Sequence, residues 1–217
     1  MIDHAITSFG RLDCVVNNAG TSSPMITIAE TTKEQFDSVF SVNVLGVMFC
    51  IKHAAPIMLR QGSGSIVTIA SGAGHRGGLS GHIYSASKAA AIHLTRSAAA
   101  ELSPGGVRLN SVSPGGIVTG IFAKAAGVSG ADADRLVNVI ADRFTTVQPI
   151  PRAGVTDDIA NAALFLASDA SSFITGQDLA VCGGLVPFGP RSGTWGESVE
   201  FRAEMSRLVT AELAKAG

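Results

Sequence analysis

The chain has 217 residues, of which 46% are hydrophobic and 15% charged, and its formal net charge at pH 7 is −1. This balance excludes a disordered chain, and the lack of a Lys/Arg block argues against a nucleic-acid surface. The length favours one domain over residues 1–217, with a small molecule as the default partner.

The three cysteines, Cys14, Cys50 and Cys182, are widely spaced and form no CxxC pair. Such spacing predicts reduced thiols in a cytoplasmic protein and gives no sign of a metal site. Residues 1–10 lack the apolar core of a signal peptide. The most apolar stretch, residues 39–58, is interrupted by three polar residues, so no membrane span is expected.

Short apolar runs alternate with helical patterns along the chain. Each expected strand is rich in Val, Ile or Leu and ends near Gly, Pro or Ser, which is typical of a parallel sheet covered on both faces. In chain order we expect a strand at 12–18, a helix at 31–62, a strand at 64–71, a helix at 84–106, a strand at 107–114, a helix at 156–169 and a strand at 177–184. The alternation predicts an α/β fold with a doubly wound, Rossmann-like parallel sheet.

Capping signals set the expected helix starts. Thr31 has Glu34 three residues later, which is the spacing of a capping box. Thr156 is the expected cap of the third helix, with two aspartates at the positive end of that helix.

Two segments fall outside the alternation. Residues 120–150 are Ala/Gly-rich and then helix-like, which predicts a lid over the substrate. Residues 185–217 form a C-terminal tail, in which apolar residues recur at helical spacing from Phe201 to Val209 and predict an amphipathic helix.

Small and polar residues follow each of the first three strands. These are the segments 17–20, 71–74 and 114–119, and ligands of open α/β sheets bind at the carboxyl ends of the strands. Tyr84, the only tyrosine in the chain, and Lys88 open the helix after the second strand. A ligand crevice is therefore expected at this edge of the sheet.

The Tyr84–Lys88 spacing suggests acid–base chemistry. Residues four apart share a helix face, and an ammonium about 5 Å away contributes roughly 3 kcal/mol at an effective dielectric of about 20. We therefore expect Lys88 and the helix N-terminus to lower the pKa of Tyr84 from ~10 toward the catalytic range. Ser71 would offer a neutral donor to an oxygen on which charge develops.

Several motifs occur in a recognisable order: NNAG, SVNVLG, a serine thirteen residues before YxxxK, and PGxxxT. In order and spacing they resemble the short-chain dehydrogenase/reductase family. The segment RAGVTDDIANAALFLASDASSFITGQDLAVCGG also resembles the C-terminal signature of that family. The resemblance runs from about residue 9 to residue 184.

The resemblance implies an NAD(P)-dependent oxidoreductase that interconverts a secondary alcohol and a ketone. Tyr84 would be the general acid/base, Lys88 would bind the nicotinamide ribose, and Ser71 would hydrogen-bond the substrate oxygen. Asn43 would hold a water that links Lys88 to solvent. The residues implied in binding NAD or NADP are Asn18, Ala19, Gly20, Tyr84, Lys88, Pro114, Gly115, Ile117 and Thr119.

The same resemblance implies a homodimer or homotetramer that acts on a small-molecule alcohol or ketone; no membrane, nucleic-acid or metal partner is expected. Two of these residues also have a purely structural interpretation. Asn43 could be a buried, hydrogen-bonded amide, and Ser71 could form the turn at the end of its strand. His75, His82 and His93 lie near the site in sequence, and we expect them to have loop or surface roles.

One feature of the family is missing. No glycine-rich TGxxxGxG turn, which would cradle a pyrophosphate, precedes Asn17. The chain is thus expected to correspond to the C-terminal two thirds of such an enzyme, without its first strands and without the residue that selects NAD over NADP. Two alternatives stay open: a non-catalytic truncated form with impaired cofactor binding that serves in interaction, and a lyase or epimerase that uses the same Tyr–Lys pair.

Overall fold

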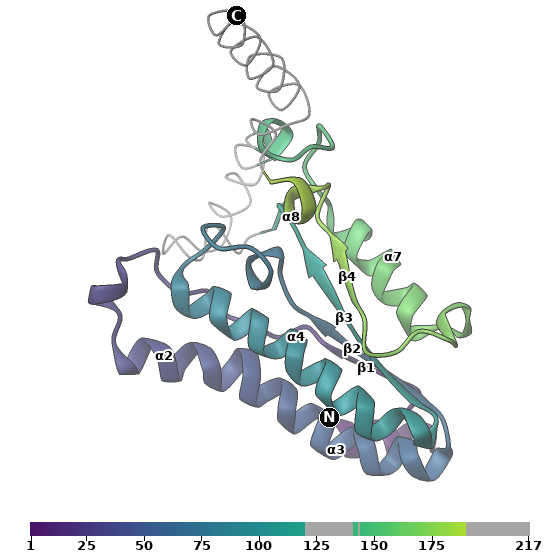
Figure 1. Ribbon diagram of the computed structural model, residues 1–217. Helices are drawn as coiled ribbons and strands as arrows, with labels where there is room; N and C mark the ends of the chain where they lie inside the picture. Colours follow the sequence, from purple (N-terminus) through teal and green to yellow (C-terminus); the bar gives the residue numbers. More distant parts are fainter. Residues whose placement is uncertain (120–140, 143, 190–217) are drawn as a thin grey trace, which may run out of the picture.

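The computed structural model describes residues 1–119, 141–142 and 144–189. Four parallel strands form one sheet in the order β1-β2-β3-β4 (Figure 1). The strands are β1 (Cys14–Asn17), β2 (Gly64–Ile69), β3 (Val107–Pro114) and β4 (Asp178–Val181). The predicted bounds of β3 are confirmed, and the other three strands are shorter than predicted because their polar and glycine-containing ends lie in loops.

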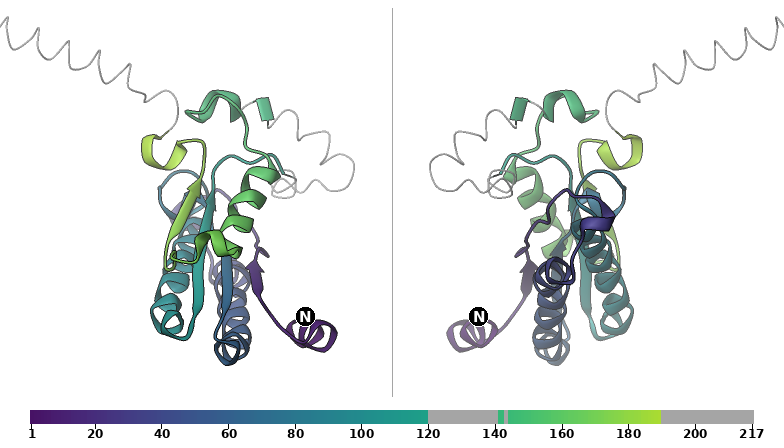
Figure 2. Two further views of the ribbon diagram at one scale, coloured as in Figure 1. Left: turned by 90° about the vertical axis from the view of Figure 1, so that its right-hand side faces the viewer. Right: turned by 90° about the vertical axis from the view of Figure 1, so that its left-hand side faces the viewer.

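Helices cover both faces of this sheet (Figures 1 and 2). On one face lie α3 (Gly46–Gln61) and α4 (His82–Leu102), and on the other lies α7 (Thr156–Ala167). The short helices α1 (Ile2–Phe9) and α8 (Leu185–Phe188) precede β1 and follow β4. The predicted α/β fold with a Rossmann-like parallel sheet is therefore confirmed.

The core has two parts, one on each face of the sheet. Met58 of α3 packs with Ile66 of β2 on one face, and Leu166 of α7 packs with Val67 and Val112 on the other. Ile66 and Val67 are neighbours in sequence, so their side chains point to opposite faces. Burial on both sides fixes the register of β2 and, with it, the start of the loop that follows.

The helix predicted over 31–62 is present from Lys33 to Gln61, with a π-helical turn in the middle. It consists of α2 (Lys33–Phe40), a π-helical turn η2 (Ser41–Leu45), and then α3. Asn43 lies inside the π-helical turn and is buried. Such turns often occur at functional sites, because the extra residue redirects a side chain.

Two predicted caps were wrong by one residue. Thr32, rather than Thr31, caps α2, and it exchanges hydrogen bonds with Gln35. Val155, rather than Thr156, precedes α7, and its N–H donates to the Asp158 carboxylate at 2.9 Å. In both cases the bonded side chain three residues after the cap defines the helix start.

The run Lys33–Gln61 is long and apolar enough, by length and composition alone, to cross a membrane. This finding corrects the expectation that its polar residues disqualify it. In the structure, Val47, Ile51 and Met58 of this run are buried in the core cluster of the sheet, which is how a core helix packs.

The predicted lid and tail lie largely outside the described residues. Residues 120–140, 143 and 190–217 are not described, and they include the expected amphipathic helix. Within the described part, residues 144–147 are helical, and α8 begins the predicted tail.

Candidate active site

The four residues of the predicted tetrad come together beyond the carboxyl end of β2. Ser71 lies two residues after β2, and Tyr84 is the third residue of α4. The Ser71 side chain lies close enough to the Tyr84 phenol to lower its pKa by hydrogen bonding. The Lys88 Nζ atom lies 5.8 Å from the centre of the Tyr84 ring. Asn43 reaches the same helix through Ser87, whose Oγ accepts from its Nδ2 at 2.9 Å.

Lys88 is an unusually buried lysine, with 5% of its surface exposed. Its Nζ donates to the backbone oxygen of Ile69, at the end of β2, at 2.8 Å. Burial disfavours the charged form and lowers the pKa of Lys88 to about 8. The ammonium is therefore held in one place, and it titrates close to physiological pH.

Gly20 brings the chain that leaves β1 close to the side chains of Lys88 and Asn43. A Cβ atom at Gly20 would lie 3.3 Å from both Asn43 Oδ1 and Lys88 Nζ, which is tighter than ordinary van der Waals contact. A side chain at this position would press on both polar groups. Glycine thus allows the backbone to pass close to the tetrad.

The pKa of Tyr84 departs from the prediction. Burial raises the pKa of the phenol above its usual value, and the hydrogen bond with Ser71 opposes that rise. The expectation that Lys88 lowers it was wrong in net direction, because the sequence does not reveal how far the phenol is removed from water. The Lys88 ammonium itself is directed at Ile69 O.

Asn43 ties the loop after β1 to the π-helical turn and α4. Its Oδ1 accepts from Thr21 N at 2.8 Å, and its Nδ2 donates to Thr21 O and to Ser87 Oγ, both at 2.9 Å. Both amide hydrogens are therefore used within the chain. The reading of Asn43 as a buried, satisfied amide is correct, and its role in holding a water stays a prediction.

Ser71 has a structural role as well as a place in the site. It caps the short turn η3 (Gly72–Gly74), where its Oγ accepts from Ala73 N at 3.2 Å. The same hydroxyl meets the Tyr84 phenol. Ser71 can therefore form the turn and also take part in the site, and the two interpretations do not exclude each other.

A serine that the sequence motifs did not indicate caps α4, the helix that carries Tyr84. Ser23 is buried, and its Oγ accepts from the backbone N–H of Tyr84 at 3.1 Å. It satisfies one of the free N–H groups at the start of α4. Ser23 lies 61 residues before Tyr84, so local capping rules could not identify it.

The loop after β3 is held by a second missed residue, Gln148. Its Oε1 accepts from Gly116 N at 2.8 Å, and its Nε2 donates to Gly116 O at 3.2 Å. Gln148 is fully buried. Gly115 N donates to Val181 O at 3.0 Å, and Ile117 pairs with Gly154. These contacts fix the backbone over most of the predicted cofactor loop.

The ends of that loop differ in their surroundings. Pro114 is the last residue of β3, and its carbonyl oxygen would lie 3.3 Å from a Cβ at Gly72, beside the Ser71 turn. Ile117 is buried, whereas Thr119 is only partly buried. The loop therefore runs from the tetrad outward to the surface.

The exit of β1 is the open part of the site. Asn18, Ala19 and Gly20 are exposed. Asn17 is buried, yet its amide nitrogen and oxygen have no hydrogen-bond partner within the part of the chain that is described. The exit of β1 therefore combines exposed small residues with a buried amide that has no partner among the described residues, which is unusual for a packed core.

His75, His82 and His93 are all exposed as residues. His82 and His93 lie on α4, as expected for surface positions. His75 differs, because its ring contacts the buried carboxylate of Asp178 at 2.8 Å. No group of His, Cys, Asp and Glu side chains that could hold a metal ion occurs among the described residues.

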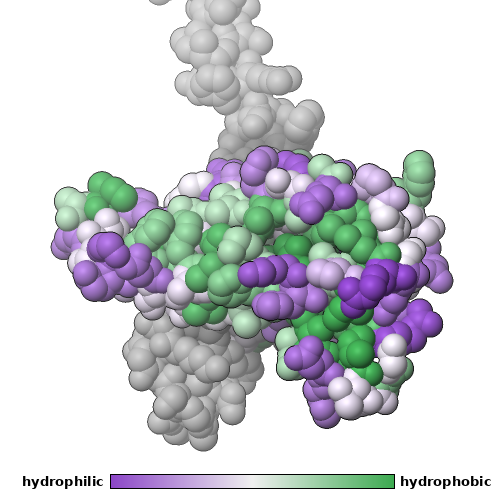
Figure 3. Space-filling view, turned by 90° about the horizontal axis from the view of Figure 1, so that it is seen from below, coloured by the Kyte–Doolittle hydropathy of each residue, from purple (hydrophilic) through white to green (hydrophobic). Residues whose placement is uncertain are grey.

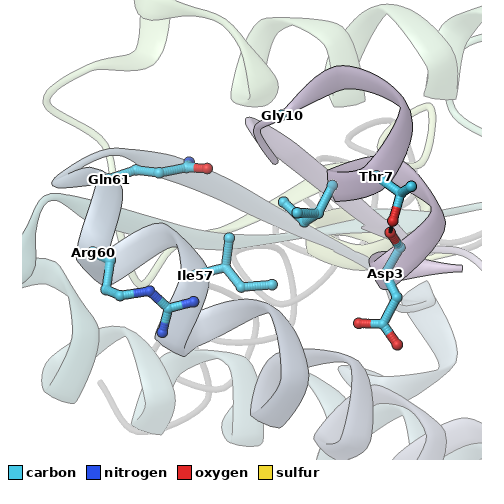
Figure 4. Close-up of a pocket in the computed structure, with 7 residues that line it drawn as sticks. Asp3, Thr7, Gly10, Ile57, Arg60 and Gln61 are labelled. Carbon is cyan, nitrogen blue, oxygen red and sulfur yellow. Dashed lines mark hydrogen bonds between the residues drawn. The ribbon is translucent and has the colours of Figure 1, made fainter.

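A hollow of about 440 Å³ lies elsewhere, between α1 and the end of α3 (Figure 4). Gln61, at its rim, exchanges hydrogen bonds with the backbone of Leu12, just before β1. The hollow is therefore at the amino end of the parallel strands, opposite the tetrad. It is lined by Asp3, Ile6, Thr7, Gly10, Ile57, Arg60 and Gln61.

Residues 1–186 match the family model described as enoyl-(acyl carrier protein) reductase. Secoisolariciresinol dehydrogenase from Forsythia intermedia is 40% identical over 84% of this chain and 65% of its own length. Two solved structures are also similar. ElxO with NADP bound has a TM-score of 0.74 at 33% identity, covering 86% of this chain and 72% of that one. NAD+-bound xylitol dehydrogenase has a TM-score of 0.73 at 32% identity, covering 84% and 72%.

The chain is shorter than these relatives. It spans 65% of the Forsythia enzyme and 66% of momilactone A synthase from Oryza sativa subsp. japonica. About two thirds of such a protein is therefore represented.

Proposed function

The chain belongs to the short-chain dehydrogenase/reductase family, and from that premise we propose that it is an NAD- or NADP-dependent oxidoreductase that interconverts a secondary alcohol and a ketone. One observation carries the proposal. The Ser71 hydroxyl acts on the pKa of the Tyr84 phenol, and the buried Lys88 ammonium lies 5.8 Å from the centre of that ring, at the carboxyl edge of a parallel sheet.

Each residue of the tetrad has a role in this proposal. Tyr84 Oη passes a proton to the substrate oxygen or takes one from it, and Ser71 Oγ orients that oxygen by a hydrogen bond. Lys88 holds the ribose of the cofactor and keeps positive charge near the phenol. Asn43 positions the loop after β1 and α4, through Thr21 and Ser87.

The pKa values favour the direction of reduction at neutral pH. Burial raises the pKa of Tyr84, so the phenol keeps its proton and can act as the acid toward a carbonyl oxygen. Lys88, with a pKa of about 8, is mostly charged at that pH. Alcohol oxidation needs the phenolate, and it should therefore require a higher pH.

A nicotinamide cofactor would supply or accept the hydride in this reaction. Its nicotinamide end would lie against Lys88, Gly20 and the loop that contains Ile117 and Thr119. Both cofactors are represented among the similar structures, NADP in ElxO and NAD+ in xylitol dehydrogenase. The proposal includes either one, because the selecting residue is not recognisable in this sequence.

We also propose that the protein is cytoplasmic and self-associates as a homodimer or homotetramer. Large hydrophobic side chains are exposed on η2 and α3 and on the edge strand β4: Leu45, Met48, Phe49 and Leu179. Figure 3 shows hydrophobic residues gathered between hydrophilic ones on the face of the molecule seen from below. Sedimentation equilibrium would test the assembly.

The decisive experiment is a fluorescence titration of the purified chain with NADH and NADPH, followed by assays with a panel of ketones. We expect saturable binding of at least one cofactor, and its oxidation when a ketone is added. Ser71→Ala serves as the control, because it should reduce turnover while leaving cofactor affinity nearly unchanged.

The other outcomes distinguish the alternatives. Failure to bind either cofactor would contradict the proposal and favour a non-catalytic interaction form, with which the unpaired amide of Asn17 is consistent. Cofactor binding with elimination or epimerisation of the substrate, and no net change in the cofactor, would instead indicate a lyase or an epimerase.

A further inference from the structure

A buried carboxylate lies next to the tetrad, and none of the roles above uses it. The side chain of Asp178, the first residue of β4, is only 4% exposed. Its Oδ1 accepts from Ser111 Oγ at 2.5 Å and from Ser113 Oγ at 2.9 Å, both on the neighbouring strand β3. Its Oδ2 lies 2.8 Å from His75 Nε2. Of these three donors, His75 alone comes from the loop that carries Ser71.

The geometry rules out Ser113 as a nucleophile in this cluster. Its Oγ lies 3.3 Å from the same His75 nitrogen that contacts Asp178. A catalytic relay needs the serine and the carboxylate on opposite ring nitrogens. Because an ionised carboxylate only accepts, His75 Nε2 must carry the hydrogen in this contact. The contact is therefore a tether between the loop and the sheet.

The loop around Ser71 behaves as one unit, which we call the Ser71 turn (residues 71–76). Its backbone bonds run from Gly74 N to Ser71 O at 2.9 Å, from His75 N to Gly72 O at 3.1 Å and from Arg76 N to Gly72 O at 3.1 Å. Such short-range bonds couple the position of His75 to that of Ser71. A shift at one end of the turn is passed to the other.

The inner side of the Ser71 turn packs against α4. A Cβ at Gly74 would lie 2.9 Å from backbone atoms of Lys88 and Ala89, so the turn already abuts α4. Gly77 and Gly78 follow it, and a Cβ at either would meet no atom within 4 Å. At the outer end, Arg76 abuts Gly189, where a Cβ would lie 2.8 Å from Arg76 Nη2. The His75 ring supplies the hydrogen bond that joins this end of the turn to the sheet.

We propose that His75 is a positioning residue, whose hydrogen bond to Asp178 fixes the turn that sets the Ser71 hydroxyl against the Tyr84 phenol. The inference rests on the proposed function for the roles of Ser71 and Tyr84. Its geometric content can nevertheless be tested in the cofactor-free protein.

The chain offers a direct probe, because Tyr84 is its only tyrosine. Tyrosine labelled isotopically at Cζ gives one NMR resonance, and tyrosinate absorbance gives one titration, both of which report on this phenol. Ser71→Ala defines the signal without the serine hydroxyl. The test variants are His75→Leu, which removes the donor, and His75→Gln, whose amide N–H can replace it. His93→Leu is the matched control at an exposed histidine of α4.

In His75→Leu we expect the Cζ resonance at neutral pH to move toward its position in Ser71→Ala. The titration midpoint of the phenol should also rise, because the Ser71 hydrogen bond lowers the pKa of Tyr84. In His75→Gln the resonance and the titration midpoint should both lie close to their wild-type values. His93→Leu should change neither of them. Far-ultraviolet circular dichroism at each pH confirms that the fold is retained.

An unchanged resonance in His75→Leu would overturn the proposal, and so would a shift that His75→Gln does not reverse. Should His75→Leu fail to fold, His75→Ala removes the same donor without adding bulk and is judged by the same criteria. In the kinetic assay we expect a lower kcat, with KM changed by less than about twofold. An inactive wild type would contradict the proposed function while leaving the NMR result valid.

Discussion

Two buried asparagines show how the two sides of the site differ. On the side of α4, Asn43 is 1% exposed, and its amide makes three hydrogen bonds, to Thr21 and Ser87. On the side of β1, Asn17 is 7% exposed, and its amide makes none among the described residues. Val16, next to it, is 48% exposed.

Under the proposed function, the bonded side around Asn43 would serve proton transfer, and the unpaired side around Asn17 would serve cofactor binding. The groups that would move a proton are buried, bonded and supported within this chain. The exit of β1 instead carries a buried polar group whose lack of a partner costs about 1–3 kcal/mol. Any ligand or chain segment that pairs with this amide would recover part of that cost, so the β1 side should gain more from a bound partner than the α4 side.

The largest expected effect is on turnover, and it should come from removing the Tyr84 hydroxyl, which lies on the α4 side of the site. Tyr84→Phe keeps the ring and its packing but loses the hydroxyl, so we expect turnover to fall by about 100-fold or more. Cofactor affinity should change little, because Lys88 and Gly20 are untouched. Steady-state kinetics with a fluorescence titration would check both. Turnover within about tenfold of wild type would contradict the role of Tyr84.

The same substitution at the two asparagines sharpens the comparison directly. Asn43→Leu leaves the backbone N–H and C=O of Thr21 without partners, and we expect the free energy of unfolding to fall by about 2–4 kcal/mol. Asn17→Leu removes an amide that is unpaired, so stability should stay the same or rise by about 1 kcal/mol.

Urea denaturation of the two variants measures both changes. Losses of similar size at the two positions would show that Asn17 is satisfied after all, and that the two sides do not differ. Addition of cofactor should narrow the gap between wild type and Asn17→Leu if the ligand pairs with the amide.

The sequence predicted the parts of the site that depend on local spacing. Tyr84 and Lys88 share a helix face because they are four residues apart, and Ser71 follows a strand that apolar residues define. The residues that hold these groups in place were not predictable. Ser23, Gln148 and Asp178 act through contacts with residues 61, 32 and 103 positions away, to which no periodicity points.

Two of the errors in the predictions have their cause in tertiary packing. The pKa of Tyr84 was expected to fall, because a charge four residues away is visible in sequence, whereas removal of the phenol from water is not. The π-helical turn at Asn43 was also not predicted, since apolar residues flank Asn43 on both sides in sequence. Both errors arise where tertiary packing overrides a correct local pattern.

The buried ammonium should make stability depend on pH. The pKa of Lys88 is lowered from 10.5 to about 8, so between these values the unfolded chain binds more protons and stability rises with pH. Relative to Lys88→Met, wild type should gain about 2 kcal/mol in the free energy of unfolding between about pH 7 and about pH 9.5. Urea denaturation of both proteins across this range provides the measurement. A constant difference would mean that Lys88 titrates normally and is not desolvated.

The smallest expected effect is on stability, and it concerns an ion pair that lies outside both sides of the site. Arg152 and Asp158 pair at 2.7 Å at the start of α7, and the hydrogen bonds from Arg152 and from Val155 N lower the pKa of Asp158 from 3.8 to about 2. Its folded pKa is depressed, so the stabilisation is present above about pH 4 and is lost as pH falls through about 2. The pair is partly exposed, and solvent screening limits the effect of Asp158→Asn to about 1 kcal/mol.

Asp157→Asn is the matched control for that variant, because Asp157 lies in the same first turn of α7 and forms no ion pair among the described residues. Urea denaturation at neutral pH should separate Asp158→Asn from wild type, and the separation should vanish near about pH 2. Equal losses in the two variants would assign the effect to the helix dipole rather than to Arg152. Because this pair touches neither asparagine, its loss should leave the contrast between Asn43→Leu and Asn17→Leu unchanged. A change in that contrast would show that the two sides of the site are coupled through α7.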